Sequence, residues 1–231
     1  MLTVLIVFAV LLLAGGGTKA VGLITEHTDT STRVLPAAPS IAVDVRTGDV
    51  RVVATGRHDV RLTTKEKRTV WGGGHAEIAG GGARLHLGDR CSKVPLVDST
   101  CRVSYVLEVP RDTTVDIVAG TGDLHVIGVT GTVRLQTATG DVHVESPSAD
   151  IAVRTATGDV EVEATDPTKV DAQSNTGDVV LSVPAQSYAV DAHAETGDEI
   201  VEVDRDDASP RRLRAHTQTG DVVVSAGLPV S

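Results

Sequence analysis

Aromatic residues are almost absent from this sequence of 231 residues. Phe, Trp and Tyr together make up 2% of the chain, as Phe8, Trp71, Tyr105 and Tyr188. Ligand pockets are usually lined by apolar and aromatic side chains, so a sugar-binding cleft built on aromatic platforms is not indicated. The scarcity of rings also predicts a narrow interior filled by smaller side chains such as Val, Ala and Thr.

Positive charge is scarce too. The chain has 21 Lys and Arg against 31 Asp and Glu, for a net charge of −10. Nucleic acid binding requires a basic surface, and none is visible, so nucleic acid is excluded as a partner. The sequence contains no Gly-x-Ser-x-Gly elbow and no phosphate loop. We therefore predict no catalytic residues and no cofactor.

Cysteine is limited to Cys91 and Cys101, ten residues apart. In an exported protein an even pair predicts a disulfide, and a loop of this size would contribute about 2–3 kcal/mol in the chain-entropy model. Two unpaired thiols are the alternative. A zinc site is not indicated, because a single cysteine pair lacks the partner spacing of zinc motifs.

One long apolar run exists, at residues 2–17, and Lys19 follows it. A spanning helix needs about 20 apolar residues and a signal-peptide core about 7–15, so the run fits neither cleanly. We expect 1–24 to form a hydrophobic helix, either a retained single-pass anchor that meets the membrane through residues 2–24 or a cleaved signal peptide of a secreted protein. Both the anchor and the signal peptide place the remaining chain outside the cytoplasm, with residues 25–40 as a polar stalk. The third alternative is that the apolar run is a buried segment of a cytosolic protein.

The tripeptide Thr-Gly-Asp is the most informative feature that is present. It occurs seven times, and the last six copies are 18, 18, 19, 20 and 23 residues apart. A fixed period near 20 residues is typical of a repeat architecture. The triads begin at Thr47, Thr121, Thr139, Thr157, Thr176, Thr196 and Thr219.

Apolar residues alternate on both sides of each triad. Counted from the Thr, positions −6, −4 and −2 and positions +3 and +5 are mostly Val, Ile, Leu, Ala or Thr, as in Val133, Leu135, Val142 and Val144. Alternation with a period of two indicates strands, and the triad turns both apolar faces to one interior.

This pattern predicts an all-β, single-domain β-solenoid, similar to a parallel β-helix, over residues 41–226, with a tail at 227–231. Its coils of 18–23 residues should stack in chain order at roughly 4.8 Å. An antiparallel meander of hairpins would show the same alternation and remains open. The segment 60–105 is expected to form wider coils or a capping layer.

The triad residues are predicted to have a structural role. Glycine supplies backbone angles that are closed to other residues, and the aspartates are expected to cap their turns. A column of carboxylates could instead bind calcium. The residues concerned are Gly48, Gly122, Gly140, Gly158, Gly177, Gly197 and Gly220, with Asp123, Asp141, Asp159, Asp178, Asp198 and Asp221.

Position +4 faces outward and supplies two further candidate sites. His125, His143 and Glu161 should lie on adjacent coils, where imidazole and carboxylate groups could bind a transition metal; simple solvation is the ordinary alternative. Val180, Ile200 and Val223 would form an exposed aliphatic surface, which can mark a partner or self-association.

The residues around the first long run of triads resemble a known family. The stretch 91–126, with the pattern Cys-x-Val-x-Tyr-x-Leu-x-Val-Pro at 101–110, is similar to the bacterial DUF4097 family of candidate adhesins. The resemblance covers about residues 40–226 and implies an extracytoplasmic β-solenoid, often on a membrane anchor. The chain departs from the pattern at Glu199, which takes the place of an apolar residue at position +3, and in the final spacing; a bulge there is our expectation.

These observations predict a non-enzymatic, membrane-anchored protein of the cell envelope that serves adhesion to an envelope protein or glycan. Two alternatives remain open. A polysaccharide-acting β-helix enzyme would need two carboxylates at a set separation. A calcium-stabilised binding module would use the triad aspartates.

Overall fold

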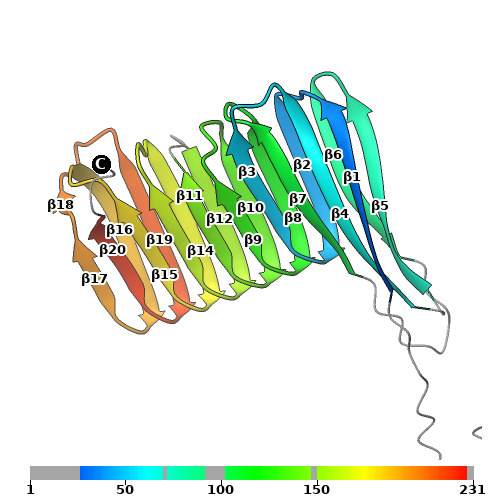
Figure 1. The fold of residues 1–231 in the computed structure, drawn as a ribbon. Helices are drawn as coiled ribbons and strands as arrows, with labels where there is room; N and C mark the ends of the chain where they lie inside the picture. Colours follow the sequence, from blue (N-terminus) through cyan, green and yellow to red (C-terminus); the bar gives the residue numbers. More distant parts are fainter. Residues whose placement is uncertain (1–26, 70–71, 92–101, 147–149, 228–231) are drawn as a thin grey trace, which may run out of the picture.

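The computed structural model describes residues 27–69, 72–91, 102–146 and 150–227. These residues are all-β, as the sequence predicts, and their twenty strands form a long row (Figure 1). No helix in this part of the chain is long and apolar enough to cross a membrane. The hydrophobic segment predicted at 1–24 and the cysteine at 101 lie outside the described residues.

The strands belong to two parallel-rich sheets. From one edge to the other, sheet A consists of β1 (His27–Pro36), β4 (Asp59–Thr69), β7 (Arg102–Pro110), β3 (Val50–Thr55), β9 (Leu124–Ile127), β11 (Val142–Ser146), β13 (Val160–Ala164), β15 (Val179–Val183), β20 (Val222–Ala226) and β17 (Glu199–Glu202). In the same direction, sheet B consists of β5 (Gly72–Gly81), β6 (Arg84–Cys91), β2 (Ser40–Thr47), β8 (Thr114–Thr121), β10 (Val133–Thr139), β12 (Asp150–Thr157), β14 (Lys169–Thr176), β19 (Arg212–Thr219) and β16 (Ser187–Thr196). The short β18 (Asp204–Arg205) pairs with the start of β16.

Consecutive strands of the triad repeats alternate between the sheets. A strand of sheet B, a Thr-Gly-Asp corner and a strand of sheet A make one unit, which we call a coil, as in β10–β11. Neighbouring coils pair in parallel and in register, so that Thr139 lies beside Thr157 and Val142 beside Val160. The meander alternative is therefore wrong for the triad repeats, because its strands would pair antiparallel.

The interior between the sheets is apolar and continuous. In the coil β10–β11 the side chains at positions −6, −4, +3 and +5 are at most 3% exposed, as the alternation predicts. Burying one such side chain contributes about 1.5–3 kcal/mol. The hydroxyls at position −2 are buried as well, and each donates to the triad glycine carbonyl of a neighbouring coil: Thr155 to Gly140 at 3.3 Å and Ser174 to Gly158 at 3.0 Å. These bonds remove the cost of a buried, unpaired hydroxyl.

The triad aspartates form a hydrogen-bonded column along the corners. Each carboxylate except that of Asp198 accepts from the backbone N–H of the triad aspartate in the next coil, rather than capping its own turn. Asp141 accepts from the Asp159 amide at 2.9 Å, and Asp159 accepts from the Asp178 amide at 2.8 Å. The column continues through Asp49, Asp123, Asp221 and Asp198. The amide donors of adjacent coils thus explain why the carboxylates can stand one above another along the corners.

This column makes a prediction about Asp159. Replacing it with alanine removes the acceptor for the Asp178 amide and should lower the free energy of unfolding by about 0.5–1.5 kcal/mol. Asp159→Asn keeps an oxygen in the same place and should stay close to wild type. Urea unfolding followed by far-UV circular dichroism measures both. Equal losses in the two variants would show that the hydrogen bond contributes nothing.

The order of the last two coils differs from the predicted one. The coil β19–β20 lies directly beside β14–β15, and the coil β16–β17 lies outside it. The expectation that coils stack in chain order is wrong here. The connection after β17 is long enough to return past its own coil, which explains the final spacing of 23 residues. No bulge at Glu199 is required.

The other end of the row is closed by antiparallel strands. β4 pairs with β7 in sheet A, β5 pairs with β6 in sheet B, and β1 lies along β4. Both alternatives predicted for 60–105 are met in part in the described residues: β4 and β5 form a capping layer, whereas β6 pairs in parallel with β2 and β7 with β3, in the manner of a coil. The prediction of a polar stalk at 25–40 is wrong for residues 27–36, which form β1. That strand is exposed along almost its whole length, so its sequence lacks the apolar alternation that would reveal it.

Candidate functional site

Position +4 forms one continuous column on the outer face of sheet A. Across β3, β9, β11, β13, β15, β20 and β17 it runs through Arg51, His125, His143, Glu161, Val180, Val223 and Ile200. The structure therefore brings together both predicted groups, with Val223 and Ile200 exchanged in order. One half of the column is polar and the other is aliphatic.

The polar half contains a compact group that we call the histidine cluster: His125, His143, Glu145 and Glu161. The His143 ring lies between two carboxylates, with Nδ1 2.9 Å from Glu161 Oε2 and Nε2 2.8 Å from Glu145 Oε1. The His125 ring meets it edge to face, with centroids 4.6 Å apart. Within the described part of the chain, Nε2 of His125 is buried and has no hydrogen-bond partner.

The two imidazoles differ in their electrostatic surroundings. Burial by itself lowers the pKa of His143, but its hydrogen bonds to Glu145 and Glu161 outweigh burial, and the pKa is raised. Burial and the neighbouring His143 both lower the pKa of His125. A positively charged neighbour disfavours a second proton, so the pair holds its first proton on His143.

Glu145 is the member of this cluster that the sequence prediction missed. It stands two residues after His143, on the same face of β11, because side chains alternate along a strand. The period-two rule would have found it if the outward position +6 had been compared as well. The triad aspartates Asp123, Asp141 and Asp159 border the same place, in a hollow of 320 Å³ that His125, His143 and Glu161 also line.

The aliphatic half consists of Val180, Val223 and Ile200, which we call the aliphatic stripe. Val180 and Val223 are half-buried, and Ile200 is 45% exposed. The stripe leads to the outermost coil. There Val190, Ala192 and Val201 are only partly buried, whereas equivalent residues in inner coils are fully covered. We call the surface formed by β16, β17 and β18 the open end.

Glu199 occupies an inward position of the open end. Its Oε1 accepts from the Ala194 backbone N–H at 2.8 Å and contacts His193 Nδ1 at 3.0 Å. Its pKa is lowered, first by the Ala194 bond. A charge at an inward edge position is tolerated because no further coil covers it in the described residues, and such charges discourage indiscriminate strand pairing.

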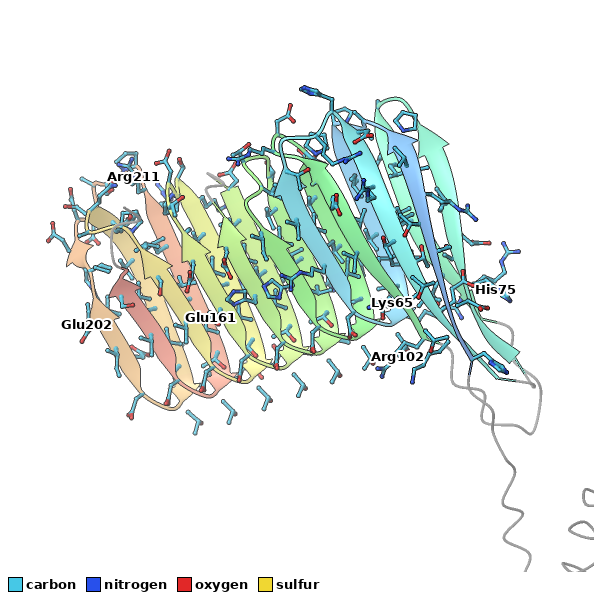
Figure 2. The ribbon with its side chains drawn as sticks, viewed as in Figure 1. Lys65, His75, Arg102, Glu161, Glu202 and Arg211 are labelled. Atoms are coloured by element: carbon cyan, nitrogen blue, oxygen red, sulfur yellow. The ribbon has the colours of Figure 1, made fainter. Side chains whose placement is uncertain are left out.

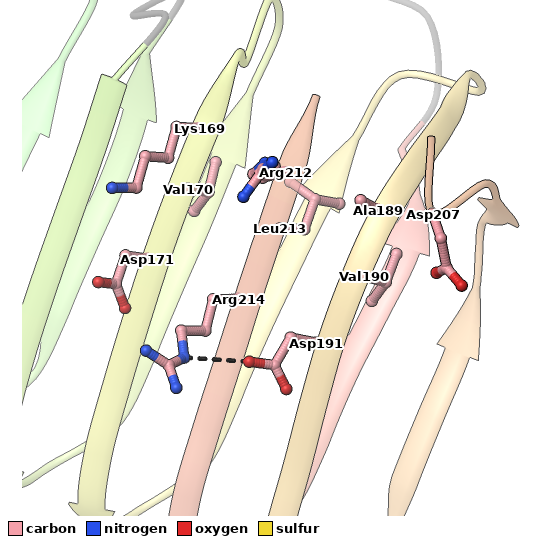
Figure 3. A pocket seen from close by; sticks show the side chains of 10 residues that line it. All are labelled: Lys169, Val170, Asp171, Ala189, Val190, Asp191, Asp207, Arg212, Leu213 and Arg214. Atoms are coloured by element: carbon pink, nitrogen blue, oxygen red, sulfur yellow. Dashed lines mark ion pairs between the residues drawn. The ribbon is translucent and has the colours of Figure 1, made fainter. Parts of the chain in front are cut away.

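A second hollow lies on sheet B, over β14, β19 and β16 (Figure 3). It has a volume of 490 Å³ and a mixed lining of cations and carboxylates. Figure 3 shows Arg214 beside Asp191, with Nε 3.2 Å from Oδ2. Asp191 Oδ1 also lies 3.0 Å from His216 Nε2, and this contact is the main reason that the pKa of the Asp191 carboxyl is lowered. Asp191 is thus shared between Arg214 and His216.

The other predicted residues that the structure describes lie in the corners and at the ends of strands. All seven triad glycines have positive φ angles, between 135° and 147°. Cys91 ends β6, and the predicted disulfide depends on Cys101, which the structure does not describe, so it stays a prediction. Asp198 lies at the outer end of the aspartate column, where its own amide donates to Asp221.

The sequence matches one known family. A model of the Toastrack DUF4097 family matches residues 107–227. The comparison with curated proteins finds no match.

Several solved structures resemble this one. A candidate cell adhesion protein from Clostridium sporogenes has a TM-score of 0.47 at 10% identity, over 87% of this chain and all of its own (100%). A candidate adhesin from Bacteroides fragilis has a TM-score of 0.48 at 14% identity, over 87% of this chain and 97% of its own. A candidate lipid-binding protein from Parabacteroides distasonis has a TM-score of 0.32 at 10% identity, over 85% and 96%. These similarities are too low to transfer a role.

Proposed function

Since the chain belongs to the Toastrack DUF4097 family, we propose that it is a non-enzymatic adhesion domain of the cell envelope. In this proposal the domain is a β-solenoid of 18–23-residue coils outside the cytoplasm. A hydrophobic helix at 1–24 tethers it to the membrane as a single-pass anchor; a secreted form, made by cleavage of that segment, is the variant of the same role.

The observation that carries the proposal is the aliphatic stripe at the open end. Ile200 is a large apolar side chain that is 45% exposed, and Val223 and Val180 continue the stripe inward along sheet A. Contiguous apolar surface of this kind marks interaction sites more often than isolated apolar residues do. The stripe also adjoins β17, whose only strand partner in the described residues is β20.

Charge indicates what kind of partner would bind there. Residues 187–207 contain eight carboxylates and one arginine: Asp191, Glu195, Asp198, Glu199, Glu202, Asp204, Asp206 and Asp207, with Arg205. We therefore commit to a protein partner that adds an extended, basic segment along β17, with apolar side chains on the stripe. Main-chain hydrogen bonds supply affinity in such strand addition, and side chains supply specificity.

A second copy fits the open end less well. Two open ends facing each other would place like charges together, which is costly. The cap at the other end of the row carries basic residues, and Figure 2 shows Lys65 and Arg102 there, far from Glu202. The open end of one copy could instead bind the basic cap of another. Sedimentation of the purified chain would detect such head-to-tail association, and this result would contradict our choice of a different protein as the partner.

The test of this function is adherence of cells that display the full chain to isolated cell envelopes. Ile200→Asp should reduce adherence about tenfold, because it places a charge in the stripe. Its matched control is Val118→Asp on β8, since Val118 is 44% exposed on sheet B. Both positions are exposed, so both variants should keep wild-type stability, and the control should keep wild-type adherence.

Two results would contradict the proposal. Cells with and without the chain could adhere equally, which would remove the adhesion role. Alternatively, both variants could lose adherence by the same factor, which would show that a general effect of added charge, and not the stripe, is responsible.

A further inference from the structure

We propose that His125, His143 and Glu145 bind one divalent transition-metal ion of the Zn²⁺ class on the outer face of sheet A. This site is independent of the adhesion surface, because it lies on β9 and β11, at the polar half of the column.

The distances suit such an ion. One ligand atom from each of the three residues lies within 4.8 Å of the others, and no other group of three potential ligands approaches as closely in the residues that the structure describes. In tetrahedral zinc sites the bonds are about 2.0–2.2 Å, so ligand atoms stand roughly 3.3 Å apart. His143 Nε2 and Glu145 Oε1 already lie 2.8 Å apart, and rotation of the exposed Glu145 side chain can open the space for an ion between them.

The backbone holds the two imidazoles in place. His125 and His143 are direct neighbours in the parallel ladder of β9 and β11, and both strands point their intervening side chains into the fully buried core. Ligands on paired strands are more precisely positioned than ligands on loops. The site therefore needs little reorganisation of the main chain.

Glu161 supplies the outer support that metal-bound histidines usually have. It lies 2.9 Å from His143 Nδ1, so it accepts from that nitrogen and leaves Nε2 for an ion shared with Glu145. A carboxylate in this position fixes the ring orientation and raises the basicity of the ligand nitrogen. Glu161 is thus a positioning residue rather than a ligand.

The chemistry of the donors selects the metal. Two imidazoles and one carboxylate suit Zn²⁺, Cu²⁺ or Ni²⁺, whereas Ca²⁺ and Mg²⁺ require mostly oxygen ligands. The buried His125 Nε2 that lacks a partner in the described residues is a further sign that the cluster is incomplete without an additional group. Three protein ligands leave one coordination position for water.

The experiment is calorimetric titration of the full chain, purified in detergent without a histidine tag, with ZnCl₂. We expect one equivalent to bind, and His125→Gln and His143→Gln each to weaken binding more than tenfold. Glu161→Gln should weaken it by about tenfold, as outer-shell changes do. The matched control is His216→Gln, because His216 belongs to the other close histidine pair, with ring centroids 6.0 Å apart.

Further measurements distinguish this site from metal binding elsewhere in the chain. Co²⁺ in place of Zn²⁺ should give the visible absorption of nitrogen and oxygen ligands, and circular dichroism should show that the glutamine variants remain folded. Binding that survives both His125→Gln and His143→Gln overturns the proposal, as does the absence of binding in the wild-type chain. Loss of binding after alkylation with iodoacetamide would assign the ion to cysteine and also overturn it.

Discussion

Replacing Gly140 with alanine should destabilise the domain by at least about 3 kcal/mol. A Cβ atom at this position would stand 2.1 Å from the carbonyl oxygen of Gly122 in the neighbouring coil. The φ angle of Gly140 is 141°, in a region that residues with a side chain rarely adopt. Neither neighbour can move aside, because the Gly122 N–H donates to Thr139 and the Gly140 N–H donates to Thr157, both at 2.9 Å.

Two other glycines serve as controls for this prediction. Gly82 has a φ of 72° but open space where a Cβ would stand, so Gly82→Ala should cost only about 1–2 kcal/mol. Gly56 has no atom within 4 Å of that position and no positive φ, so Gly56→Ala should be neutral or slightly stabilising. Urea unfolding measures all three. A Gly140→Ala variant as stable as Gly56→Ala would refute the close contact between corners.

Replacing Val222 with glutamate should be as damaging, whereas the reverse change at Glu199 should not be. Both residues occupy position +3 of their coils, and they lie side by side in β20 and β17. Val222 is fully buried, so Val222→Glu would place an unpaired carboxylate in the core and cost about 3–5 kcal/mol. Glu199→Val loses the bond to the Ala194 amide, and should change stability by no more than about 1.5 kcal/mol.

This pair of variants also tests the order of the coils. If the coils stacked in chain order, β20 would be at the edge, and Val222→Glu would be tolerated. Thermal unfolding of the two variants distinguishes the arrangements. Glu199→Val should in addition increase self-association at high concentration, because it removes the inward charge that protects the edge; sedimentation velocity measures this effect.

Much of the coil could be predicted from sequence because inward and outward side chains alternate strictly along its strands. Val133, Leu135, Val142 and Val144 alternate on either side of a three-residue corner, so their burial could be predicted, whereas the choice between a solenoid and a meander needed the strand pairing. The triad glycine follows from the same pattern, since the corner needs backbone angles that other residues avoid. The position of His143 beside His125 follows from the stacking of equivalent residues.

Coil order was harder to predict because each coil offers the same two faces to its neighbours. The apolar positions that the repeats share therefore do not show which coil is outermost. Two signals in the sequence did carry this information. Glu199 breaks an otherwise apolar position, and the connection that follows it is the longest among the last six triads. Together they mark an edge coil and a chain that doubles back.

The strand β1 could not be predicted for a different reason. It pairs with β4 through its backbone, while its side chains from His27 to Val34 are exposed. Hydropathy patterns report burial, so a strand that buries almost nothing leaves no trace in them. Glu145 was missed because outward positions were compared only at +4, although the alternation along β11 already placed it on the same face as His143.

The position of the coil β19–β20 also has a consequence for biosynthesis. Residues 187–202 leave the ribosome before residues 212–226, yet the later segment lies between them and the coil β14–β15. The earlier segment must therefore wait unattached or give up a first contact with β14–β15. Assembly of this end therefore cannot follow the direction of synthesis, because β16–β17 reaches its final place only once β19–β20 is present to pair with it.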